Sequence, residues 1–302
     1  MISPVETAAP GPSAPQARFA SPVPVETTNL THALRSEWTK IRTVRSTMWT
    51  LGIMLVLVLG INLLMLWAIL ADGSAYFSDP VLSPGLYGLM LGQLAVITLG
   101  VLVITSEYGT GMIRTTFTAC PKRTRVLTAK AIVFFGLTFT VTTLACTVTA
   151  LINWAALSGK TATTDCCEVS GGVTFKEGLT SATGYEWLGA TVGVGLYVAL
   201  LGLLALAVGT LLRHSAGAIT AMMGIVLLPL IAAIFMQAPG LYKVQEKLVE
   251  YSTPVGLAAL YRVRMAGDYD DRINGLPQLV TLAVVTALAL AGAYAVLAKR
   301  DV

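Results

Sequence analysis

The chain contains six apolar stretches that are each long enough to cross a lipid bilayer. They run over residues 49–71, 85–105, 130–156, 187–212, 217–237 and 276–297. About 20 helical residues cover the roughly 30 Å hydrocarbon core of a membrane. Backbone groups in lipid must bond internally, and the alternating pattern of an outer-membrane barrel is absent. The sequence therefore predicts an all-α membrane protein with six transmembrane helices.

Composition excludes an ordinary soluble domain. The chain is 55% hydrophobic and only 12% charged, whereas soluble domains carry about 25% charged residues. No soluble segment has a basic patch interleaved with aromatic residues, so nucleic acid is not an expected partner. The basic residues behind the net charge of +4 instead indicate which segments lie on the cytoplasmic side of the membrane.

The distribution of lysine and arginine predicts that both termini are cytoplasmic. With that topology, the cytoplasmic segments hold 13 of the 20 basic residues and 5 of the 16 acidic ones, leaving 7 basic and 11 acidic residues outside. Basic residues are retained on the cytoplasmic side of membranes. We therefore expect a multi-pass protein of a bacterial cell membrane, exposed to lipid on its outer faces.

Residues 1–28 are predicted to be a disordered cytoplasmic tail, because they contain six of the 13 prolines among small and polar residues. This tail lacks the apolar region and the small-residue cleavage pattern of a secretory signal. Residues 29–302 are predicted to form one transmembrane domain.

Residues 30–48 have the spacing of an amphipathic, basic helix. Its polar face carries Lys40 and Arg42, and Trp38 suits the headgroup level of the membrane. Such a helix would lie along the inner membrane surface and bend into the first span near Ser46 or Thr47. The alternative is a solvated extension of the first span.

The loop over residues 106–130 is compact and basic, and it predicts a short helix. Gly109 and Gly111 allow a sharp exit from the second span, Thr110 can cap a new helix, and Pro121 stops it. About two to three turns result. One face of this helix carries Met112, Ile113, Thr116, Phe117 and Cys120. Lipid, the protein's own helices or a partner protein must cover that face.

This loop resembles that of the permease subunits of type-2 ABC transporters, particularly the stand-alone permeases of actinobacteria. The resemblance covers the order and orientation of all six spans, and its motif residues are concentrated in the loop and the preceding segment. They are Glu37, Trp38, Lys40, Arg42, Glu107, Gly109, Thr110, Gly111, Arg114, Thr115, Pro121, Arg123, Arg125 and Lys130.

The resemblance implies that the loop helix is a coupling helix, seated in a groove of a separate ATP-binding subunit. Met112, Ile113 and Phe117 would pack there, between the ends marked by Thr110 and Pro121. Arg114 and Glu107 would position the helix ends. Glu107 has a structural alternative, an ion pair with Arg42, Arg45 or Arg114.

No nucleotide, metal or catalytic site is expected on this chain. Residues 159–161 read Gly-Lys-Thr, like the end of a phosphate-binding loop, but Trp154 replaces the glycine that such a loop needs. The two histidines, His32 and His214, lie in separate segments and give neither a zinc site nor a catalytic triad. ATP and Mg²⁺ would be bound by the partner, so the chain itself is not expected to be an enzyme. The adjacent pair Cys166 and Cys167 could form a disulfide or remain two thiols.

Polar residues within the spans are sparse. Ionisable residues are nearly absent there, which argues against an ion-coupled transporter. Asn62, Gln93 and Asn153 could line a substrate pathway or form interhelical hydrogen bonds. Small residues four apart, Gly88 with Gly92 and Gly189 with Gly193, predict close helix contacts.

Residues 238–275 form a long outer segment that predicts two short re-entrant or interfacial helices separated at Pro254. Similar helices commonly cap the outer end of type-2 exporters.

We therefore expect the membrane-spanning subunit of an ABC exporter, a homodimer of permeases with two ATP-binding subunits. The rival hypothesis is a non-transporting anchor or sensor that recruits a cytoplasmic protein through the same loop. A mostly apolar lumen suits lipids, peptides and drugs alike, so no substrate class is predicted.

Overall fold

The computed structural model describes residues 29–72, 80–119, 123–160, 174–176, 179–236, 241–263 and 275–299. Within these ranges, six helical segments are long and apolar enough to span a membrane. They are α2 (Arg45–Ala71), α3 (Pro84–Gly109), α5 (Arg123–Leu157), the continuous segment Gly184–Leu212, α8 (Ser215–Phe235) and α11 (Leu276–Lys299). All six predicted spans are confirmed, and they fit a multi-pass membrane protein.

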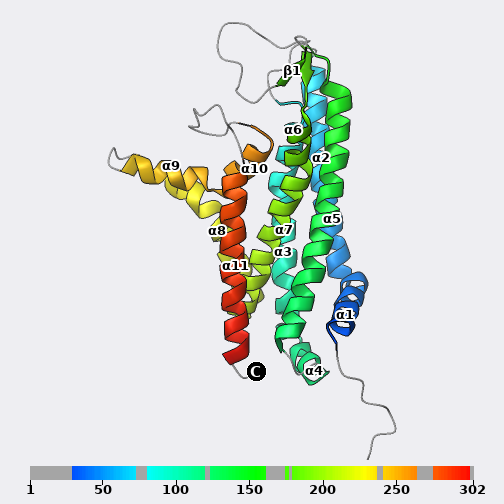
Figure 1. Cartoon of the computed structure of the whole chain (residues 1–302), viewed down its shortest axis with the longest axis vertical. Coiled ribbons are helices and arrows are strands. Elements are labelled where there is room, and N and C mark those ends of the chain that lie inside the picture. The colour runs from blue at the N-terminus through cyan, green and yellow to red at the C-terminus, as the bar shows by residue number, and fades with distance from the viewer. Residues whose placement is uncertain are drawn as a thin grey trace, which may run out of the picture.

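The helical bundle has two distinct ends (Figure 1). One end, called here the α4 end, carries α1 (Leu30–Thr43), α4 (Met112–Ala119) and the C-terminal end of α11. A two-stranded antiparallel hairpin of β1 (Thr174–Lys176) and β2 (Leu179–Ser181) lies at the opposite end. That end, called the α10 end, also carries α10 (Thr253–Leu260). The spanning part is all-helical as predicted, and the hairpin is a small addition to it.

Helix α1 is separate from the first span. Val44 has an extended backbone, with φ −77° and ψ 113°, and this breaks the chain between α1 and α2. The bend therefore comes two to three residues earlier than the predicted Ser46 or Thr47. Glu37 and Ile41 on one face of α1 are buried, whereas Trp38 on another face is exposed.

The central helices are α3 and α7 (Val194–Leu212), which are the most buried of the spanning segments. Glycines let their backbones approach closely: a Cβ on Gly100 of α3 would lie only 2.4 Å from the Gly202 carbonyl of α7. A Cβ on Gly88 would likewise lie 2.5 Å from the Val58 carbonyl of α2. The predicted contact at Gly88 is thus confirmed within one chain. Helices α2, α8 and α11 leave most of their apolar side chains uncovered.

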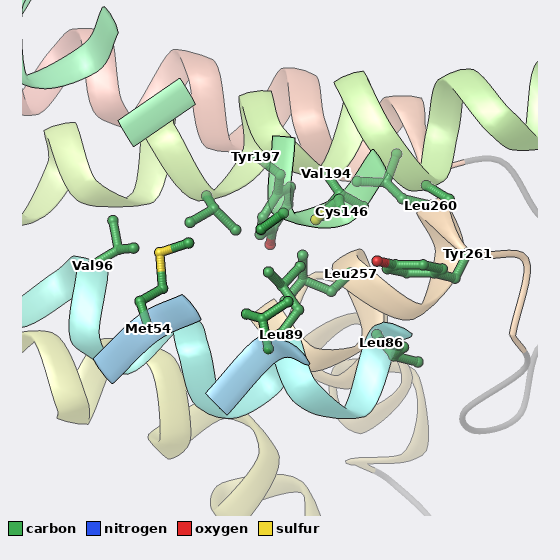
Figure 2. Close-up of a cluster of buried hydrophobic side chains, with 14 of the residues drawn as sticks. Met54, Leu86, Leu89, Val96, Cys146, Val194, Tyr197, Leu257, Leu260 and Tyr261 are labelled. Carbon is green, nitrogen blue, oxygen red and sulfur yellow. The ribbon is translucent and has the colours of Figure 1, made fainter. Parts of the chain in front are cut away.

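Helix α10 is inserted into the core beside the other helices. Figure 2 shows Leu257 lying beside Leu89 of α3, and both belong to the same buried cluster as Cys146 of α5 and Tyr261, which directly follows α10. The fourth span begins as α6 (Gly184–Leu188), and a π-helical turn, η1 (Gly189–Gly193), joins it to α7. A Cβ on Gly189 would lie 2.6 Å from the Leu260 carbonyl, so this turn fits closely against the end of α10.

The two short helices predicted between the last spans are confirmed as helices. Pro254 lies in the first turn of α10, where its missing N–H is tolerated. The preceding helix, α9 (Tyr242–Glu250), has no buried residue and projects sideways from the bundle (Figure 1). Their placement relative to the membrane stays a prediction.

Candidate functional site

Four charged side chains meet at the α4 end of the bundle. Glu37 and Lys40 come from α1, Glu107 from the last turn of α3, and Lys130 from the early turns of α5. We call these four residues the charge cluster. It gathers segments that are as many as 93 residues apart in the sequence.

Each lysine of the charge cluster contacts both glutamates. Lys130 Nζ donates to Glu37 Oε2 at 2.6 Å and to Glu107 Oε1 at 3.0 Å. Lys40 Nζ donates to Glu37 Oε1 at 2.9 Å and to the same Glu107 Oε1 at 3.0 Å. Two positive and two negative charges therefore balance in a closed ring of ion pairs.

Most of this ring is shielded from solvent. The side chain of Lys130 is only 2% exposed, and Lys40, at 28%, is the most accessible member. Burial lowers the pKa of Lys40, but the carboxylates of Glu37 and Glu107 outweigh it and raise the pKa above the ordinary 10.5. Lys40 is therefore protonated throughout the physiological range.

The charge cluster joins α1, α3 and α5 at one point. Removing one partner from a buried ion pair leaves an uncompensated charge, which costs about 3–5 kcal/mol. The helices α1, α3 and α5 are thus held together at this end by electrostatic contacts as well as by packing.

Two of the three arginines considered as partners of Glu107 do not pair with it, and the side chain of the third, Arg114, lies outside the described residues. Glu107 pairs with Lys40 and Lys130, and not with Arg42 or Arg45. Arg42 instead lies over the ring of Trp38, with its Cζ 5.9 Å from the ring centroid. Ionisable residues were predicted to be nearly absent within the spans, and Glu107 near the end of α3 and Lys130 of α5 are buried exceptions, whereas the buried Glu37 lies on α1, outside the spans.

Lys130 is the member that sequence reasoning missed. It was treated as the boundary of the third span, yet α5 begins at Arg123, which puts Lys130 well inside the helix. A lysine flanked by Ala129 and Ala131 within an apolar helix is a signal for a buried charge partner. This pattern does not identify the partner of Lys130, because the partner depends on which helices pack together.

A sharp turn connects the charge cluster to α4. Gly111 has φ +72°, a left-handed conformation that glycine adopts without strain. Thr110 does not show the predicted capping role. Its N–H and its hydroxyl both bond the Ser106 carbonyl, which closes the end of α3.

Helix α4 follows the predicted bounds of the coupling helix. Met112 is 49% exposed, whereas Ile113 is 4% exposed and packs inside the chain. The apolar face of α4 is therefore covered at Ile113 by the protein's own helices, which is one of the three alternatives considered from the sequence. The side chains of Arg114 and Phe117, as well as Cys120 and Pro121, lie outside the described residues.

The turn between α7 and α8 lies next to the charge cluster. Arg213, in a left-handed conformation with φ 54°, ends α7. Its Cζ lies 5.4 Å from the ring centroid of Tyr108, the neighbour of Glu107. His214 then caps α8 by accepting a hydrogen bond from Gly217 N–H. The cation–π contact links a fourth segment to the same place.

Asn62, Gln93 and Asn153, the polar residues predicted within the spans, are all buried. Asn153 of α5 donates to Asn62 of α2 at 2.8 Å, which is the interhelical hydrogen bond considered from sequence. Gln93 donates to the Met90 carbonyl of its own helix at 3.1 Å. A role of these three residues in a substrate pathway stays a prediction.

Metal-ligating residues do not gather within the described ranges: no group of three His, Cys, Asp or Glu residues could hold an ion there. Cys146 is buried and unpaired, and the predicted pair Cys166 and Cys167 lies outside the described residues. Lys160 follows the end of helix α5 at Leu157, and not a strand as a phosphate-binding loop requires. Neither a protein-family model nor a curated protein matches the chain.

Proposed function

We propose that this chain is the membrane-spanning permease subunit of an ATP-driven ABC exporter. In this proposal both termini lie in the cytoplasm of a bacterial cell, and two copies of the chain form a homodimer. Each copy binds one ATP-binding subunit, which carries the ATP and Mg²⁺. The resemblance of residues 106–130 to type-2 permeases is its starting point.

One observation supports the proposal most strongly: a short helix stands at the end of the bundle, directly attached to a buried ring of charges. Helix α4 presents Met112 outward, and Gly111 separates it from α3 by a sharp turn. Glu107 lies only four residues before that turn. A displacement of α4 therefore acts first on the contacts of Glu107.

The proposed mechanism uses this connection. Closure of the ATP-binding subunits would push α4 against the bundle, and α3 would transmit the movement to Lys130 of α5 and Glu37 of α1. The spans would then rearrange and release cargo to the outer side.

The decisive experiment is purification of the intact chain from its own host in mild detergent, followed by mass spectrometry of the proteins that accompany it. We expect an ATPase with a phosphate-binding loop to co-purify. Met112→Asp and Phe117→Asp should each abolish this association, because a carboxylate on the face proposed to pack against the ATPase cannot be desolvated without a partner.

Thr118→Asp provides the matched control, since Thr118 is exposed on another face of α4. It adds the same charge to the same helix and should leave the association intact. An ATPase bound equally by all variants would refute the assignment of α4 as the coupling helix. If a cytoplasmic protein without an ATPase domain is retained instead, the chain is an anchor or sensor and not an exporter subunit.

A further inference from the structure

A pocket of about 260 Å³ adjoins the charge cluster. It lies between α1, the first turn of α2 and the last turns of α3. All four members of the charge cluster contribute to its lining. The lining also contains six apolar residues, Ile41, Val44, Leu99, Leu102, Val103 and Met112, and four hydroxyl residues, Ser46, Thr47, Ser106 and Thr110. A ligand that fits this pocket must therefore present both polar and apolar groups to its lining.

Glu107 brings an unsatisfied acceptor to this pocket. Its side chain is 8% exposed, and both lysines of the charge cluster contact the same oxygen, Oε1. The other oxygen, Oε2, is buried and has no hydrogen-bond partner among the described residues. Leaving a buried carboxylate oxygen unbonded is unfavourable, so the pocket favours a ligand with a hydrogen-bond donor.

Lys40 offers the complementary group. A lysine ammonium has three N–H donors, and Lys40 uses two of them, toward Glu37 and Glu107. Its side chain is also the most exposed of the four. Because the charge cluster is already neutral, a zwitterionic ligand with an ammonium for Glu107 and an anion for Lys40 preserves the charge balance.

The pocket lies at the depth of lipid headgroups. Trp38 of α1 and Trp49 of α2 are 45% and 73% exposed, and Arg42 and Arg45 lie between them in the sequence. Exposed tryptophans with flanking basic residues mark the boundary between hydrocarbon and headgroups. The zwitterionic amphiphile available at this depth is a membrane phospholipid.

We propose that this pocket binds an aminophospholipid of the phosphatidylethanolamine type. The primary ammonium donates to the Glu107 carboxylate, whose buried Oε2 becomes accessible when the side chain rotates toward the pocket. The phosphate accepts from Lys40, and the start of an acyl chain lies against Leu99, Leu102 and Val103. Bound lipid would stabilise the contact between α1 and α3. The proposal does not depend on the identity of any cytoplasmic partner.

Native mass spectrometry of the full chain tests the proposal. The protein is released from micelles that contain equal amounts of phosphatidylethanolamine, phosphatidylcholine and phosphatidylglycerol with identical acyl chains. We expect phosphatidylethanolamine to be retained on the order of tenfold more than phosphatidylcholine, because a trimethylated nitrogen has no N–H to donate. Phosphatidylglycerol, which lacks the ammonium, should be retained as weakly as phosphatidylcholine. Equal retention of the three lipids would overturn the proposal.

A pair of tryptophan variants locates the site without disturbing the charge cluster. Leu102→Trp fills the apolar part of the pocket and should abolish the preference for phosphatidylethanolamine. Ile132→Trp places the same ring on α5, two residues from Lys130, where the side chain is 48% exposed outside the pocket lining. It should keep the preference. A preference that survives Leu102→Trp would place the lipid elsewhere and refute this site.

Free phosphoethanolamine distinguishes a lipid from a soluble ligand with the same headgroup. We expect no displacement of bound lipid by an excess of phosphoethanolamine, because the soluble compound leaves the apolar wall uncovered. Complete displacement would show that the headgroup alone carries the binding, which would refute the assignment to a membrane lipid.

Discussion

The two ends of the bundle are held together by different forces. At the α4 end, the charge cluster joins three helices through ion pairs of 2.6–3.0 Å around a pocket. At the α10 end, glycines bring backbones into direct contact, and a Cβ on Gly189 would lie 2.6 Å from the Leu260 carbonyl. The ion pair found there, Glu186 with Arg262, is longer, at 3.5 Å.

This difference indicates which end can respond to a binding event. Electrostatic contacts weaken gradually as charges separate, whereas interlocked backbones tolerate little displacement. Glu186 mainly caps α6, because its carboxylate accepts from Thr183 N–H at 2.9 Å. The α10 end is therefore suited to hold the helices in place, and the α4 end is suited to change.

Replacing Lys130 should have the largest effect on stability. Lys130→Ala leaves Lys40 alone to balance two buried carboxylates, and we expect a loss of about 3–5 kcal/mol in the free energy of unfolding. Thermal unfolding in detergent measures this loss as a lower Tm. The double variant Lys130→Met with Glu107→Gln should recover most of it, since that pair is removed without an unpaired charge.

Lys247→Ala is the control for this experiment. Lys247 pairs with Glu250 on α9, but its side chain is 66% exposed. Surface ion pairs contribute about 0–1 kcal/mol, so this variant should unfold close to the wild type. Equal Tm values for Lys130→Ala and Lys247→Ala would mean that the charge cluster does not hold the α4 end.

A methyl group at Gly189 should weaken the α10 end by a smaller amount. Its carbon would collide with the Leu260 carbonyl, and overpacking of this kind costs about 1–3 kcal/mol. The matched substitution Gly136→Ala has nothing within 4 Å of the added Cβ. It should leave Tm unchanged or raise it, because alanine is the better helix former. Similar shifts for both variants would argue against the tight packing of α10.

Removing the ion pair at the α10 end should have little effect. The side chain of Arg262 is 30% exposed and lies 3.5 Å from Glu186. Glu186 is itself buried, but it keeps its hydrogen bond from Thr183 N–H when Arg262 is replaced. Arg262→Gln should therefore cost about 1 kcal/mol, the net value of one hydrogen-bonded contact, measured by the same thermal unfolding. A loss as large as that of Lys130→Ala would remove the contrast between the two ends.

The smallest effect concerns alkaline pH. The pKa of Lys40 is raised above 10.5 in the folded protein, so its stabilising contribution is complete below that value. It is lost only as pH rises through the raised pKa. The difference in Tm between the wild type and Lys40→Gln should thus stay constant around neutral pH and shrink above pH 10.5. A difference that already shrinks near neutral pH would show that another group controls it.

Helix positions followed from the sequence more closely than side-chain partners did. The six helical spans and a short helix in the loop after the second one were predicted because long apolar runs and glycine turns are local signals. Of the arginines considered as partners of Glu107, Arg42 and Arg45 do not pair with it, and the side chain of Arg114 lies outside the described residues. The ion pairs with Lys40 and Lys130 depend on how α1, α3 and α5 pack together, which no local pattern specifies. Ile113 is buried although the adjacent Met112 is exposed, and this too depends on how α4 packs against the bundle.

The sequence by itself determined that this chain carries six helices long and apolar enough to cross a membrane, because a hydrocarbon solvent demands long apolar runs with internally bonded backbones. It also determined the short helix after the second span. Only the tertiary structure decided which charges meet, which glycines touch a neighbouring backbone and where a pocket remains. Those features depend on distances between helices remote in the chain, and no local pattern of residues encodes such distances.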